Sequence, residues 1–112
     1  MDLQITEQDD STLIVALRGR FDAFNATSVK ASWQNNEGLR FIIIDLSETT
    51  FLDSVALAIL VQGLKTSRLR GGNFIIANPS EAARTIFELT AMDRAFTITL
   101  SVEDALDLVV AL

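Results

Sequence analysis

The chain has 112 residues, of which 49% are hydrophobic, and its formal net charge is −6. It contains no cysteine and no histidine, which excludes disulfides, thiolate nucleophiles, Cys-based zinc sites and histidine general bases. This length and composition indicate one folded domain over residues 1–112, and the negative charge opposes binding to nucleic acid or to an anionic membrane surface.

The first part of the chain predicts three strands and one helix. Residues 3–6 alternate apolar and polar side chains as in a short edge strand, and residues 12–19 form a stronger, largely buried strand. A loop over residues 19–24 leads to a helix that Asn25 can cap, and a third strand follows over residues 40–46. The apolar positions of the helix recur at helical spacing at Ala26, Val29 and Trp33.

The second part of the chain alternates helices and strands. A connector over residues 47–52 precedes an unusually apolar helix over residues 54–69, and strands are predicted over residues 73–77 and 96–100. The helix between these strands has Asn78 as its predicted cap, Pro79 at its first position and Glu81 at its third. The last helix has an apolar stripe from Val102 to Val110. This order predicts an α/β fold with a mixed β-sheet of about five strands packed with about four α-helices.

The most informative feature is the pair Asp53-Ser54 at the start of the apolar helix. Asp and Ser are preferred N-cap residues, so the pair can be a helix cap and nothing more. A helix N-terminus also favours added negative charge, which makes an exposed hydroxyl there a good site for phosphorylation. The pair by itself leaves both interpretations open.

The same helix has more apolar side chains than one buried face needs. The face predicted to pack on the sheet follows the i, i+3, i+4, i+7 pattern and consists of Leu57, Leu60, Val61 and Leu64. This leaves Val55, Ala58 and Ile59 outside the predicted core, beside the Ser54 hydroxyl. They form either a small partner-binding patch or a surface that the loop after the second strand covers.

Several segments follow one another in a characteristic order. Ile44-Asp45-Leu46-Ser47 precedes Phe51-Leu52-Asp53-Ser54, and the segments 17–22, 70–73, 78–80 and 89–93 flank them. Over essentially the whole chain this ordered set resembles the STAS domain of bacterial anti-sigma factor antagonists. The resemblance implies a single STAS domain with the STAS fold.

The resemblance also implies a partner-switching protein that is not an enzyme and needs no cofactor, metal or catalytic residue. In the family, the unphosphorylated antagonist binds an anti-sigma factor that is itself a serine kinase, and thereby frees the sigma factor. Phosphorylation of the serine after the motif aspartate releases the antagonist, and a serine phosphatase resets the cycle. That serine is Ser54 here. The residues predicted to bind the partner are Asp22, Asp53, Val55, Ala58 and Ile59.

The chain departs from the family pattern directly after Ser54. The family usually has a small polar residue and then glycine, where this chain has Val55 and Ala56. Alanine in place of glycine strengthens the helix by up to ~1 kcal/mol. The added methyl groups lie beside the acceptor hydroxyl, where they either tune partner choice or mark a domain that is no longer phosphorylated.

Two other functions are compatible with parts of the sequence. STAS domains also serve as constitutive binding subunits, for example in a bacterial lipid-transport complex. A metal-assisted enzyme built on Asp22, Asp45 and Asp53 would need a phosphate-bearing substrate site, and the sequence has no glycine-rich phosphate loop. The basic residues Lys65, Arg68 and Arg70 are interpreted as a solvated helix end.

Localisation and oligomeric state are expectations from the same sequence. The N-terminal segment lacks the features of a signal peptide, and the longest apolar run, residues 55–61, is far shorter than the ~20 residues that span a bilayer. We therefore expect a cytoplasmic protein without membrane insertion. We expect a monomer or a weak dimer, because the charged neighbours of the first strand discourage edge pairing.

Overall fold

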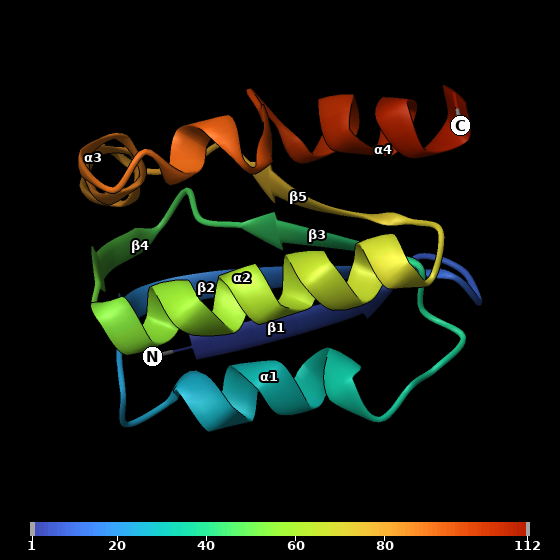
Figure 1. Ribbon diagram of the computed structural model, residues 1–112, viewed down its shortest axis with the longest axis horizontal. Helices are drawn as coiled ribbons and strands as arrows, with labels where there is room; N and C mark the ends of the chain where they lie inside the picture. Colours follow the sequence, from blue (N-terminus) through green and yellow to red (C-terminus); the bar gives the residue numbers. More distant parts are fainter. Residues whose placement is uncertain (1, 112) are drawn as a thin grey trace.

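The computed structural model describes residues 2–111 and consists of a six-stranded mixed sheet with helices on both faces (Figure 1). In chain order the elements are β1 (Asp2–Glu7), β2 (Thr12–Phe21), α1 (Ala26–Gln34), β3 (Phe41–Asp45), β4 (Thr49–Leu52), α2 (Ser54–Leu69), β5 (Asn73–Ala77), α3 (Glu81–Leu89), a 3₁₀ turn (Met92–Arg94), β6 (Thr97–Thr99) and α4 (Val102–Ala111). The predicted α/β class with a mixed sheet and four helices is confirmed.

The main sheet has the strand order β1-β2-β3-β5-β6, with β1 antiparallel to β2 and the other neighbours parallel. Besides its antiparallel pairing with β1, the ten-residue strand β2 pairs in parallel with two strands, first with β3 and then with β4. The register shifts between Gly19 and Arg20, where Gly19 has a φ of 89° that favours glycine. Residues 49–52 were predicted as part of a connector, and this was wrong because they form β4.

The sheet separates two apolar clusters. The larger cluster lies under α1, α2 and α3 and includes Trp33, whose ring meets the ring of Phe74 edge-on at a centroid distance of 5.3 Å. The smaller cluster lies on the other face, where Ala105 of α4 packs with Ile43 and Ile75. Ala26, Val29 and Trp33, the apolar positions of the predicted helix, are all buried.

The buried face of α2 differs from the predicted one. Leu60 and Leu64 are buried as expected, but Leu57 and Val61 are only partly buried. The fully covered positions of the helix are Ala56, Leu60, Gly63, Leu64 and Ser67. Ala56, Gly63 and Ser67 on this face are small because the helix lies close to the sheet. A Cβ on Gly63 would be 2.3 Å from the ring of Phe74.

Other predicted positions also differ. α3 begins two residues later than expected, because Asn78 adopts a left-handed φ of 47° and the Ser80 hydroxyl accepts the Ala83 N–H at 3.2 Å. β6 covers only three residues of the five predicted. Val110 was expected on the buried stripe of α4 but is 86% exposed.

Within residues 2–111 no helix combines the length and the hydropathy that crossing a bilayer requires.

Candidate functional site

The start of α2 is fixed by the side chain of Asp53. Its backbone is extended, with φ −98° and ψ −179°, and Oδ1 accepts the N–H of Ala56 at 2.9 Å, as an N-cap does. The second carboxylate oxygen, Oδ2, accepts the N–H of Ala23 at 2.9 Å. The Asp53 N–H in turn donates to the carbonyl of Phe21 at 3.3 Å. The cap of α2 therefore also holds the loop that follows β2.

That loop is organised by its own polar side chains. The carboxylate of Asp22 accepts the Phe24 N–H at 3.0 Å and lies 3.5 Å from the guanidinium of Arg20, and its side chain is 15% exposed. Asn25 precedes α1 as predicted, but its side chain does not cap the helix. It accepts the Asp22 N–H at 3.0 Å and donates to the carbonyl of Arg20 at 2.7 Å, which closes the loop.

Ser54 is the first residue of α2 and is exposed. The first N–H groups of a helix have no partner within the helix, and only that of Ala56 is bound by the Asp53 side chain. Ser54 thus places a hydroxyl at the positive end of a helix of 16 residues. The geometry suits the acceptance of an anionic group by that hydroxyl.

Exposed apolar side chains flank Ser54. Phe24 on the held loop is 99% exposed, Val55 is 45% exposed, and Phe51 of β4 is 37% exposed beneath the guanidinium of Arg20 at 3.9 Å. Phe21, three residues before Phe24, is fully buried, whereas Phe24 projects into solvent. An exposed aromatic beside a structured hydroxyl is typical of a protein-binding surface.

A shallow depression of about 410 Å³ extends from Ser54 along the outer side of α2. We call it the Ser54 depression; its lining residues are Ser54, Leu57, Ala58, Val61, Gln62 and Lys65. Leu57 and Val61, which were assigned to the core, thus also form part of the surface. The exposed hydroxyl, the loop that Asp53 holds and this depression make up one face of the molecule.

The residues predicted to bind the partner differ in their exposure on this face. Asp22 and Asp53 meet through the 21–25 loop, and Val55 and Ala58 are exposed near Ser54. Ile59 was predicted to lie outside the core, and this was wrong because it is partly buried and packs against the larger cluster. Periodicity missed this because it assigned the buried face to the large residues of α2.

The carboxylates considered for metal chemistry have structural partners. Asp45 accepts the Ser47 N–H at 3.0 Å at the end of β3, and Asp53 is occupied as described above. Among the residues that the structure describes, no three acidic side chains approach closely enough to hold a metal ion.

Comparison with known proteins agrees with this geometry. The anti-sigma-B factor antagonist of Listeria monocytogenes is 29% identical over 93 residues, which cover 80% of this chain and 81% of that protein. The Thermotoga maritima protein TM1081 superposes with a TM-score of 0.87 at 26% identity, over 96% of this chain and 93% of that one. Unphosphorylated SpoIIAA shares the fold, with a TM-score of 0.88 at 19% identity over 99% and 98% of the two chains. The model of the STAS domain matches residues 4–105, and the chain therefore belongs to the STAS domain family.

Proposed function

We propose that this protein is an anti-sigma factor antagonist that works as a phosphorylation-controlled partner switch. Unphosphorylated, it binds an anti-sigma factor with serine kinase activity and frees the sigma factor; phosphorylation of Ser54 releases it, and a serine phosphatase restores it. The protein acts in the cytoplasm, where the kinase finds ATP, and has no catalytic activity of its own. The similarity to the antagonist from Listeria monocytogenes supports the choice of partner.

The observation that carries the proposal is the exposed Ser54 hydroxyl at the N-terminus of α2, beside the exposed side chains of Phe24 and Val55. The apolar side chains supply the contact area of a protein interface. The hydroxyl lies where a new negative charge acts on that interface directly. One site thus serves both for binding and for its control.

Phosphorylation is expected to leave the fold almost unchanged. A phosphate adds about −1.5 to −2 charges, and a helix N-terminus stabilises negative charge by about 0.3–1 kcal/mol at an exposed position. The carboxylates of Asp22 and Asp53 near the site offset part of this gain. The two effects oppose each other, so the stability of the domain changes little.

The interface responds differently to the same group. A phosphate that loses its water without gaining a cationic partner is strongly unfavourable at an apolar contact. A penalty of about 3 kcal/mol weakens binding more than 100-fold. Phosphorylation therefore switches the interaction without unfolding the protein.

The proposal is tested with the anti-sigma factor kinase of the same organism, with and without ATP. Wild type, Ser54→Ala and Ser54→Asp are compared, with intact mass to detect phosphate and calorimetry to measure affinity. We expect one phosphate on wild type and none on Ser54→Ala. We expect the phosphorylated form and Ser54→Asp to bind at least 100-fold more weakly.

A matched control uses another hydroxyl at a helix start. Ser101 accepts the Asp104 N–H at 3.0 Å at the start of α4, on the opposite side of the sheet. Ser101→Ala should still accept one phosphate and still be released by it. Tight binding without any phosphate on Ser54 would instead identify a constitutive binding subunit, and the absence of binding would refute the antagonist role.

A further inference from the structure

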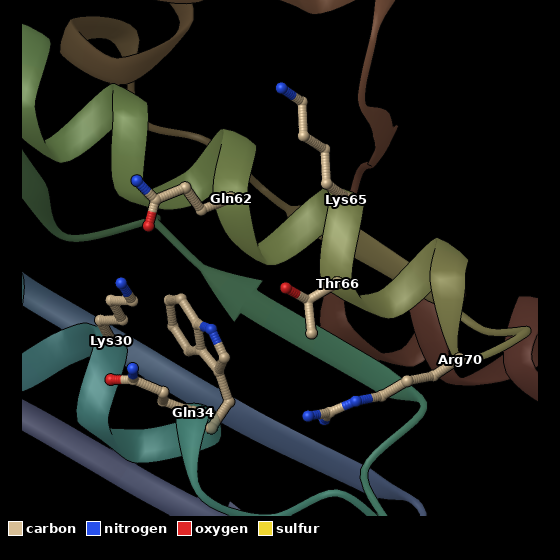
Figure 2. A pocket seen from close by; sticks show the side chains of 7 residues that line it. Lys30, Gln34, Gln62, Lys65, Thr66 and Arg70 are labelled. Carbon is tan, nitrogen blue, oxygen red and sulfur yellow. The ribbon is translucent and has the colours of Figure 1, made fainter.

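A second surface feature lies between α1 and α2, away from the Ser54 hydroxyl. It is a groove of about 470 Å³ with Lys30, Trp33 and Gln34 on the α1 side and Gln62, Lys65 and Arg70 on the α2 side. Figure 2 shows the amino group of Lys30 directed from α1 toward α2, Gln34 extending alongside α1 toward Lys30, Arg70 reaching from the end of α2 toward α1, and Lys65 directed to solvent. We call it the α1–α2 groove.

The groove is positively charged in an acidic protein. It collects both lysines of the chain and one arginine, whereas the net charge of the protein is −6. None of the described residues that line it is acidic. The ion pairs of the described residues, Arg18 with Glu48 and Arg20 with Asp22, lie elsewhere. Within the part of the chain that the structure describes, none of the three cations of the groove is in an ion pair with a carboxylate.

Hydrogen bonds to the backbone fix the position of the Arg70 side chain in the groove. One of its terminal nitrogens, Nη1, donates to the carbonyls of Asn36 and Leu39 at 2.9 and 3.1 Å, which ties the end of α2 to the loop after α1. The remaining N–H groups of the guanidinium are available to an anion. The side chain is thus positioned before any ligand binds.

The α1–α2 groove is continuous with the Ser54 depression. Gln62 and Lys65 line both. Lys65 follows Ser54 by eleven residues, which is three turns and about 16 Å along the helix. A standard interface of about 800 Å² on each partner is about 30 Å across, so a partner centred on Ser54 reaches the groove.

We propose that the α1–α2 groove binds an acidic segment of the same protein partner that docks on Ser54; this inference rests on the proposed function. The groove is an open trough whose rim residues Gln34, Gln62 and Lys65 are exposed. A small-molecule site buries most of its ligand, whereas such a trough suits an extended stretch of Asp and Glu side chains. The groove attracts and orients the acidic segment of the partner, and phosphorylation of Ser54 controls whether the partner stays bound.

This division of roles has a kinetic consequence. Charges at the edge of an interface mainly accelerate association, by 10-fold or more at low salt, and the effect declines as salt is added. The groove and the phosphate lie farther apart than the screening length of about 8 Å at physiological ionic strength. Their effects on binding should therefore be independent.

The test compares two double variants with the same change of net charge. Lys30→Glu/Lys65→Glu reverses the groove, and Arg84→Glu/Arg94→Glu reverses two exposed arginines of α3 and the 3₁₀ turn. Association with the anti-sigma factor is measured at low and physiological salt. We expect the groove variant to associate at least 10-fold more slowly at low salt and the control variant to change less than 3-fold.

Two further measurements separate the alternatives. Introduced into the groove variant, Ser54→Asp should weaken binding by the same factor as in wild type, because distant sites add independently. In amide NMR spectra, hexaglutamate should shift the signals of Lys30, Gln62 and Lys65, whereas inorganic phosphate and ATP should not. The single variant Lys65→Glu, at an exposed position, repeats the test if the double variant does not fold.

The outcomes distinguish this inference from the function on which it rests. If the anti-sigma factor fails to bind wild type, the antagonist role is refuted. If wild type binds and switches but the groove variant associates as fast as the control variant, the acidic-segment proposal is overturned and the switch stands. Shifts caused by phosphate or ATP and not by hexaglutamate would identify a small-anion site and also overturn it.

Discussion

The carboxylate of Asp53 joins the start of α2 to Ala23, a residue thirty positions earlier in the chain, through a hydrogen bond of 2.9 Å. The other oxygen of the same carboxylate caps the helix. One side chain therefore fixes both the position of Ser54 and the position of the loop that exposes Phe24. The two halves of the proposed interface are held in one arrangement before a partner arrives.

Removal of this carboxylate should destabilise the domain. We expect Asp53→Ala to lower the free energy of unfolding by about 2 kcal/mol, since loss of an N-cap alone accounts for about 1–2 kcal/mol. Asp53→Asn keeps an oxygen for the Ala56 N–H and loses the bond to Ala23, so its loss should be about 0.5–1 kcal/mol. Urea denaturation measures both.

A control for the Asp53 variants is Ser101→Ala, which removes the hydroxyl that accepts the Asp104 N–H at the start of α4, on the opposite face of the sheet. It should lower stability by a similar amount but leave partner affinity unchanged, whereas Asp53→Ala should reduce affinity as well. Equal affinities of the two variants would show that the Asp53 bridge has no part in binding.

Phe24 should matter for binding and not for stability. Its side chain is 99% exposed, so Phe24→Ala should change the free energy of unfolding by less than about 0.5 kcal/mol. Aromatic residues at the centre of an interface contribute about 2 kcal/mol or more, which corresponds to a loss of affinity of about 30-fold. Calorimetry with the anti-sigma factor measures it. Leu89→Ala, at a position 78% exposed on α3, is the control and should bind normally.

Gly63 should not tolerate a side chain. An alanine Cβ there would lie 2.3 Å from one atom of the Phe74 ring and within 3 Å of two more, so α2 would have to move away from β5. We expect Gly63→Ala to destabilise the domain by about 1–3 kcal/mol in thermal or urea denaturation. At Gly38 the nearest atom to a new Cβ is at 3.3 Å on an exposed side chain, and Gly38→Ala should be nearly neutral. Equal stabilities would contradict the close packing of α2 on the sheet.

Val55 should limit the rate of phosphorylation. Its side chain is 45% exposed beside the acceptor hydroxyl, and Val55→Ala removes two methyl groups while improving helix propensity. We expect the kinase to modify this variant several-fold faster, as followed by intact mass. Val110→Ala makes the same change at a position 86% exposed on α4, away from Ser54, and should leave the rate unaltered. A faster rate in both variants would point to an effect that does not come from the site of phosphorylation.

Much of the fold follows from local patterns. The strands, the helices and the helix start at Asp53-Ser54 could be predicted because hydrophobic periodicity and capping are properties of short segments. β4 could not, since Thr49–Leu52 lacks apolar alternation and becomes a strand only by pairing with β2 beyond the bulge at Gly19. That pairing joins residues about thirty positions apart, and neither segment alone has a sequence pattern that predicts it.

The candidate site shows the same limit. The exposed Ser54 was predictable as a helix start, but the buried face of α2 was not, because Ala56, Gly63 and Ser67 owe their burial to a close approach to the sheet. The predicted face was chosen for large apolar residues. The hydrogen bond from Ala23 to Asp53 and the α1–α2 groove both depend on tertiary neighbours, which sequence periodicity does not predict.

The strand β4 restricts what a kinase can modify. It leads directly into α2, so Ser54 sits on a backbone that the sheet fixes on one side and the helix on the other (Figure 1). A short peptide with the sequence around Ser54 has neither constraint, because isolated helices of this length are marginal in water. Such a peptide should be a poor substrate, and nascent or misfolded chains should escape phosphorylation. Phosphorylation would then regulate only correctly folded copies of the protein.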